Sequence, residues 1–119
     1  MNISILVIDN DNANLDCVSK KLSLLGYAVY CAPGSSQAVE WLRTHKVDLV
    51  IADCRTGNMN GGRLLDLILN GNPGRIPIIL MNDKRDSYLR MGFDGFLQKP
   101  FTMNELYSEV ERVRLLIGN

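Results

Sequence analysis

Three short apolar runs in the sequence end in polar side chains that could bind a ligand. Residues 47–52 run into Asp53, and the runs beginning at Ile3 and Ile76 end at Asp9 and Asn82. Each run has the length and the Leu, Val and Ile content of a strand buried on both faces, as in a parallel sheet. The carboxyl ends of parallel strands meet at one edge of an open sheet, where the loops form a ligand-binding crevice. The sequence therefore predicts that these polar side chains converge on one crevice.

Strand and helix patterns alternate along the whole chain. This alternation favours an α/β fold with a five-stranded parallel sheet and helices on both faces. The predicted strands are residues 3–9, 27–31, 48–53, 76–81 and 94–98. Apolar residues at steps of three and four predict helices that carry Leu15 to Leu25, Ala38 to Leu42, Leu64 to Leu69 and Leu106 to Ile117.

Local signals predict where two of these helices begin or end. Gly26 is expected to end the first helix, and Ser35 or Ser36 to cap the second. Between the last two strands, Lys84 to Met91 leaves room for only about two helical turns. We therefore expect the fourth helix to be short.

Length and charge limit the classes of function. The 119 residues suffice for a single domain, residues 1–119. Its 13 basic and 13 acidic residues balance, so no overall field draws this domain to nucleic acid or to a membrane surface. The N-terminus has no signal sequence and the apolar runs are only strand-length, so we expect a cytoplasmic protein.

Several reactive or aromatic side chains have simple structural interpretations. Cys17, Cys31 and Cys54 lack paired metal-site spacing, and we expect them to be reduced and mostly buried. Trp41 is interpreted as a core residue and His45 as a surface residue near a helix end. The charges of Arg112 and Arg114 are interpreted as facing solvent.

Taken together, these motifs resemble the receiver domain of two-component response regulators, and most of all the receivers of hybrid histidine kinases. The resemblance covers the whole chain and implies a flavodoxin-like, doubly wound fold. It rests on these segments: Ile8-Asp9-Asn10-Asp11, Asp53, Asn58-Met59-Asn60-Gly61, Ile76-Pro77-Ile78-Ile79, and Gly92 to Gln98 followed by Lys99-Pro100-Phe101. The likeness to hybrid-kinase receivers comes from Asn14 and Leu25-Gly26-Tyr27.

Similarity to this family implies a role for each candidate site residue. Asp53 would accept a phosphoryl group from a phosphohistidine on a histidine kinase or histidine phosphotransfer domain. Lys99 and Asn82 would contact the phosphoryl oxygens, which need positioning and charge neutralisation. Such a domain assists its own phosphorylation and dephosphorylation without being a turnover enzyme, and this chain would be such a receiver or part of a hybrid histidine kinase.

The resemblance also implies a cofactor and a switch. The magnesium ion of the family would be held by Asp9, Asn10, Asp53 and the backbone carbonyl of Arg55. Phe96 occupies the position of the aromatic switch residue. The peptide bond before Pro100 is expected to be cis, which would direct Lys99 inward.

The sequence departs from the family pattern at the site itself. Asn10 replaces one of two adjacent acids, which predicts weaker magnesium binding. Asn82 stands where Thr or Ser is usual, and Asp83 adds a carboxylate where a small residue is usual. Lys99 follows Asn82 by only 17 positions, and the missing residues fall in the fourth helix.

Two alternative functions remain open at this point. The departures are compatible with a degenerate receiver that binds a partner but is phosphorylated weakly or not at all. Ile8-Asp9-Asn10-Asp11 also resembles the nucleophile motif of haloacid dehalogenase-like phosphatases, although Ala13 is atypical of that motif and the chain has no room for a cap domain. Labelling of Asp53 by a phosphodonor separates these functions.

Overall fold

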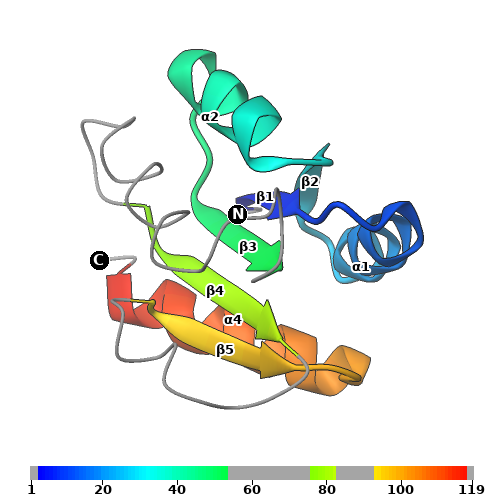
Figure 1. The fold of residues 1–119 in the computed structure, drawn as a ribbon. Coiled ribbons are helices and arrows are strands. Elements are labelled where there is room, and N and C mark those ends of the chain that lie inside the picture. Colours follow the sequence, from blue (N-terminus) through cyan, green and yellow to red (C-terminus); the bar gives the residue numbers. More distant parts are fainter. Residues whose placement is uncertain (1–2, 54–75, 83–92, 118–119) are drawn as a thin grey trace.

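The computed structural model describes residues 3–53, 76–82 and 93–117 and contains a five-stranded parallel sheet (Figure 1). The strand order is β2-β1-β3-β4-β5, and every neighbouring pair is parallel. The strands are β1 (Ser4–Ile8), β2 (Ala28–Ala32), β3 (Leu49–Asp53), β4 (Ile78–Asn82) and β5 (Gly95–Gln98). The predicted fold class is confirmed, and each strand lies within two residues of its predicted bounds.

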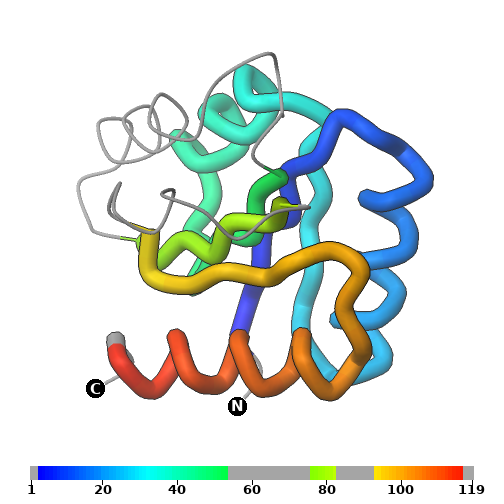
Figure 2. The backbone as a smooth tube through the Cα atoms, turned by 60° about the horizontal axis from the view of Figure 1, so that its bottom comes forward, coloured from blue at the N-terminus to red at the C-terminus, as the bar shows by residue number. Residues whose placement is uncertain are grey.

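In the part of the chain that the structure describes, three helices cover the two faces of this sheet. They are α1 (Asn12–Leu24), α2 (Ser35–Thr44) and α4 (Met103–Ile117). Figure 2 shows α1 and α4 beside each other, and their apolar residues share one core cluster with one face of the sheet. The other face packs against α2. The predicted helix at Leu64 to Leu69 and the shortened fourth helix at Lys84 to Met91 lie outside the described residues.

The central strands are the most deeply buried part of the described chain. Every side chain of β3 is buried, and so is every side chain of β1 after Ser4. These strands are apolar at nearly every position because the side chains on both of their faces meet a layer of helices. In the described part of the chain, no helix combines the length and hydropathy that crossing a membrane requires.

Local backbone chemistry sets the bounds of β4 and α1. The fourth strand begins at Ile78 rather than at residue 76, because Pro77 has no N–H to donate; its carbonyl accepts a hydrogen bond from Val50 N at 3.0 Å. Gly26 follows the last turn of α1 with a φ of 97°, a conformation that side-chain-bearing residues rarely adopt. The prediction that Gly26 ends this helix is confirmed.

Two predictions about individual side chains are wrong. Gly34 is the N-cap of α2, and Ser35 is a buried helical residue, so neither Ser35 nor Ser36 caps the helix with its side chain. Cys17 and Cys31 are exposed free thiols; Cys17 lies on α1 next to the buried Val18, and Cys31 lies on the edge strand β2. Cys54 lies outside the described residues.

Trp41 and His45 form a stacked pair at the end of α2. Trp41 is half-buried against the core, as predicted. The ring of exposed His45 lies parallel to it, with 3.6 Å between the centroids. The pair also contacts Tyr30 on β2, whose ring centroid is 5.1 Å from that of Trp41. This contact helps attach α2 to the edge of the sheet.

A buried hydrogen bond joins the start of β2 to α4. The hydroxyl of Tyr27 donates to Glu111 Oε2 at 2.6 Å. Burial, together with this bond to a carboxylate, raises the pKa of Tyr27 above its ordinary value of 10.0. The folded protein therefore keeps this proton at pH values where the unfolded chain has lost it.

Replacing Tyr27 with phenylalanine is expected to lower the free energy of unfolding by about 1.5 kcal/mol near neutral pH, where the hydrogen bond contributes fully. The contribution is fully present below the unfolded pKa of ~10 and is lost as the pH rises through the higher folded pKa. Urea denaturation of both proteins at several pH values measures it. The difference should shrink above about pH 10, whereas a pH-independent difference would contradict the prediction. The exposed Tyr30→Phe is the matched control.

Candidate functional site

The ends of β1 and β3 place two carboxylates side by side. These strands are neighbours, and Ile8 lies opposite Ala52. Asp9, which follows β1, and Asp53, which ends β3, are therefore at adjacent positions. Both are almost completely buried, with exposed fractions of 1% for Asp9 and 3% for Asp53. Two buried acids this close require a cation or a proton to offset their repulsion.

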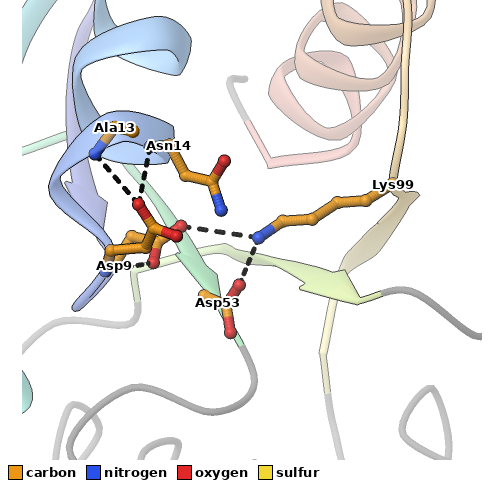
Figure 3. Close-up of polar contacts among 6 residues, drawn as sticks. Asp9, Ala13, Asn14, Asp53 and Lys99 are labelled. Atoms are coloured by element: carbon orange, nitrogen blue, oxygen red, sulfur yellow. Dashed lines mark hydrogen bonds and ion pairs between the residues drawn. The ribbon is translucent and has the colours of Figure 1, made fainter.

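Lys99 supplies a positive charge to both acids (Figure 3). Its Nζ forms an ion pair with Asp53 Oδ2 and lies 3.5 Å from Asp9 Oδ2. Lys99 follows β5, and β4 lies between β5 and β3, so the side chain extends over the end of β4. Its backbone N–H donates to the carbonyl of Asn82, the last residue of β4, at 2.8 Å. The peptide bond between Lys99 and Pro100 is cis, as predicted.

Burial and neighbouring charges shift the pKa values of Asp9 and Lys99. Burial raises the pKa of Asp9, and the neighbouring charge of Asp53 adds to this effect. A hydrogen bond from Asp11 N at 2.9 Å and the charge of Lys99 oppose it. For Lys99, burial disfavours the charged form, but the hydrogen bond to Asp53 and the charges of both acids outweigh burial and raise its pKa. The lysine is therefore held as a cation.

The remaining predicted site residues lie around this centre. Asn10 is exposed in the turn directly after Asp9, and Asn82 is half-buried at the end of β4. Phe96, on β5, is 9% exposed and packs in the core. Arg55 and Asp83 lie outside the described residues.

Two features near the centre were not assigned by sequence reasoning. Asp11 is the N-cap of α1, and its Oδ1 accepts hydrogen bonds from Ala13 N at 2.9 Å and Asn14 N at 3.2 Å. The carboxamide of Asn14 points toward the ammonium group of Lys99 in Figure 3. The first of these had a sequence signal, an aspartate before a helical pattern; the second depends on how α1 lies relative to the segment after β5.

An open groove of about 410 Å³ leads away from Lys99 between α1 and the segment after β5. Lys21 lies at this groove, with its Nζ 5.6 Å from the ring centroid of Phe101. The complete lining is Asn14, Cys17, Val18, Lys21, Lys99, Pro100 and Phe101. The groove therefore joins the buried charges to the surface.

The donor set fits a hard divalent cation. Asp9 and Asp53 present carboxylate oxygens to one shared cation, the ammonium group of Lys99, and oxygen ligands are those that magnesium prefers. Among the described residues, no group of three or more His, Cys, Asp or Glu side chains forms a metal cluster. Magnesium needs only one or two protein carboxylates, because it keeps several waters.

Comparison with known proteins gives a consistent result. A family model for the response regulator receiver domain matches residues 5–111. The chain is 30% identical over 114 residues to the heme response regulator HssR of Staphylococcus saprophyticus, covering 91% of this chain and 50% of that protein. It is 30% identical over 106 residues to the hybrid signal transduction protein dokA of Dictyostelium discoideum, covering 86% of this chain and 6% of that protein.

Solved structures share the fold over almost the whole chain. The receiver domain of sensor histidine kinase PA1611 from Pseudomonas aeruginosa is 26% identical, with a TM-score of 0.83 and 100% of both chains covered. That structure is described with a magnesium ion coordinated in its active-site cleft. The chemotaxis response regulator CheY4 of Vibrio cholerae has a TM-score of 0.84 at 22% identity, covering 95% of this chain and 99% of that one, and supports the fold alone.

Proposed function

Because this chain belongs to the response regulator receiver domain family, we propose that Asp53 accepts a phosphoryl group from a phosphohistidine in two-component signalling. The observation that carries this proposal is the placement of the buried Asp53 carboxylate against the ammonium group of Lys99, with Asp9 beside it. This arrangement provides a nucleophilic oxygen, a fixed positive charge and little water.

The transfer exchanges one bond to phosphorus for another. A carboxylate oxygen of Asp53 attacks the phosphorus, the N–P bond to the donor histidine breaks, and the electron pair of that bond returns to the imidazole. Lys99 moves with its charge from the free carboxylate to a phosphoryl oxygen, and Asn82 at the end of β4 is placed to contact the same group. The low exposure of Asp53 limits the access of water to the acyl phosphate.

We assign the cofactor of this reaction to magnesium, held by Asp9, Asn10, Asp53 and the backbone carbonyl of Arg55. The ion supplies positive charge to the phosphoryl oxygens. Two buried carboxylates sharing one cation support this assignment, as does the magnesium described in the Pseudomonas receiver. A neutral Asn10 lowers the affinity expected for the ion.

The proposed partner is a histidine kinase or a histidine phosphotransfer domain. Receiver domains are phosphorylated by such proteins, and the likeness to a hybrid signal transduction protein agrees with this. The groove between α1 and Phe101 opens onto Lys99, whose ammonium group pairs with Asp53, and we propose that the donor side chain approaches the site along it. We propose no nucleic-acid or membrane contact for this domain, and the cytoplasm as its compartment.

The chain spans about half the length of the curated regulators that it matches, 50% of the Staphylococcus protein and 45% of the regulator ycf27 of Cyanidium caldarium. The activity proposed here is therefore that of a receiver unit, residues 1–119, and not of a whole regulator.

The geometry favours a receiver over the dehalogenase-like phosphatase. That chemistry requires Asp9 to be the nucleophile and Asp11 to face the same substrate. Here Asp11 Oδ1 is bound to the first backbone N–H groups of α1, and Lys99 pairs with Asp53. Asp53 is therefore the better placed nucleophile.

Incubation with phosphoramidate and magnesium tests the proposal. Intact-mass measurement is expected to show a single phosphoryl adduct that requires magnesium and is absent from Asp53→Asn. Asp48→Asn is the matched control, because exposed Asp48 lies in the same segment and binds Ser4 instead of the site. An adduct that persists in Asp53→Asn and is lost in Asp9→Asn would favour the phosphatase. If wild type forms no adduct with this donor or with phosphorylated kinase, the chain is a degenerate binding module.

A further inference from the structure

Two glutamate–arginine pairs on α4 face different parts of the sheet. Arg112 binds Glu109 Oε2 at 2.8 Å, and Arg114 binds Glu111 Oε2 at 3.2 Å, each pair spaced by three residues. The Glu111 pair continues to Tyr27 at the start of β2. The Glu109 pair continues instead to β5, the strand that carries Phe96 and leads into Lys99.

Glu109 binds the backbone of β5 at the switch position itself. The N–H of Phe96 donates to Glu109 Oε2 at 2.8 Å. Because β5 is the last strand of the sheet that the described residues form, one side of its backbone has no neighbouring strand among them to accept such bonds. A helix side chain thus takes the place that a strand would occupy. The contact fixes the backbone that carries the Phe96 ring.

Arg112 completes the contact from the other side. Its guanidinium group donates to Glu109 through Nε and Nη2. Nη2 also donates to the backbone carbonyl of Asp94 at 3.0 Å. The hydrogen bond to Glu109 raises the pKa of Arg112, so the guanidinium group stays charged. The sequence-based interpretation of Arg112 as a charge that only faces solvent is therefore wrong.

Gly95 lets α4 approach this closely. A Cβ placed on Gly95 would lie 2.6 Å from Glu109 Oε2 and 2.9 Å from Val113 Cγ2. Gly95 therefore lets the charged Glu109–Arg112 pair pack closely against β5. The pair binds backbone groups of Asp94 and Phe96, the residues on either side of this glycine. Small displacements of β5 must be transmitted to Glu109 or break its bond to Phe96.

We propose that the Glu109–Arg112 pair couples the phosphorylation state of the site to α4, by fixing the backbone of Phe96. Both residues are positioning residues, because they act through β5 and touch neither the acids nor the phosphoryl group. The route is short: Lys99 follows Phe96 by three positions and must change its ion-pair partner when Asp53 is phosphorylated. The inference rests on the proposed function of Asp53.

Hydrogen exchange tests this coupling in the phosphorylated and unphosphorylated protein. Amide exchange along α4 and β5 is measured with and without phosphoramidate and magnesium, and the adduct is quantified by mass in the same samples. Glu109→Ala removes the bond to Phe96. Glu111→Ala is the matched control, since it deletes the same side chain from the same helix along with its own arginine pair and its bond to Tyr27.

The expected result is that all three proteins form the adduct, whereas the phosphorylation-dependent change in α4 exchange falls about threefold or more in Glu109→Ala alone. Glu109→Gln keeps an acceptor oxygen for the Phe96 N–H and should retain most of the change. If Glu109→Ala is too unstable to measure, Arg112→Ala against Arg114→Ala is the equivalent comparison.

A wild-type response in Glu109→Ala, or an equal loss in Glu111→Ala, would overturn the coupling while leaving phosphorylation of Asp53 intact. If wild type forms no adduct with phosphoramidate, the exchange is measured with phosphorylated kinase as the donor, and absence of the adduct with both donors would overturn the proposed function and this inference with it. The two failures are distinguishable, because the adduct and the exchange are read from the same sample.

Discussion

Replacing Lys99 with methionine is expected to lower the free energy of unfolding by about 3 kcal/mol at pH 7 in metal-free buffer. Methionine keeps much of the buried length of the side chain but leaves Asp9 and Asp53 without their shared cation. Both carboxylates are almost fully buried, so water cannot screen their repulsion effectively. Urea denaturation of the two proteins measures the loss.

Two comparisons separate this effect from the general cost of losing a lysine. Lys20 pairs with Asp16 on the surface of α1, where both side chains are largely exposed, and Lys20→Met should change stability by less than about 0.5 kcal/mol. Magnesium should stabilise Lys99→Met more than wild type, because the ion then binds without displacing an ammonium group. Equal losses in the two lysine variants would contradict the prediction.

Replacing Asn10 with aspartate is expected to tighten magnesium binding about tenfold or more. Asn10 lies in the exposed turn after Asp9, so an aspartate carboxylate introduced there would add one negative charge at the proposed metal site. A full charge about 4 Å from the ion, at the dielectric of a protein surface, contributes several kcal/mol before screening, and tenfold requires only ~1.4. The same charge should lower stability in metal-free buffer by adding to the repulsion between the acids.

Isothermal titration with magnesium measures this change, and Asn12→Asp is its control. Asn12 is also an exposed asparagine, at the start of α1, so the substitution adds the same charge two positions away and outside the proposed ligand set. If both variants tighten binding equally, the effect is one of general charge. If neither does, Asn10 is not a ligand position, and weak magnesium binding needs another explanation.

The strands of the sheet were predictable from the sequence because each of them carries a strong local signal. Strands such as β3 are apolar at nearly every position, since helices cover both faces, and the polar residue that ends each run marks the functional edge. Asp9 and Asp53 could be placed at one site because parallel strands end at the same edge, and the family resemblance placed Lys99 beside them. Distances of 46 and 90 positions in sequence separate Lys99 from the two acids, yet the topology brings them together.

Other features depended on packing that local patterns do not record. Cys31 is exposed because β2 is an edge strand, and strand order is not visible in the residues of β2 alone. Glu109 and Arg112 have the spacing of an ordinary surface ion pair, and only the approach of α4 to Gly95 turns them toward β5. The role of Asp11 as an N-cap follows only from where α1 begins in the folded chain.

The strand order also sets the sequence in which the site is assembled during translation. Asp9 and Asp53 lie on neighbouring strands from the first half of the chain, whereas Lys99 follows the last strand, at the edge of the sheet. Synthesis proceeds from the N-terminus, so a ribosome-bound chain can pair β1 with β3 before Lys99 exists. In that interval the two acids lack the ammonium group of Lys99, and another cation or protons must offset their repulsion. The last strand therefore completes the sheet, and Lys99 after it supplies the positive charge that the two acids need.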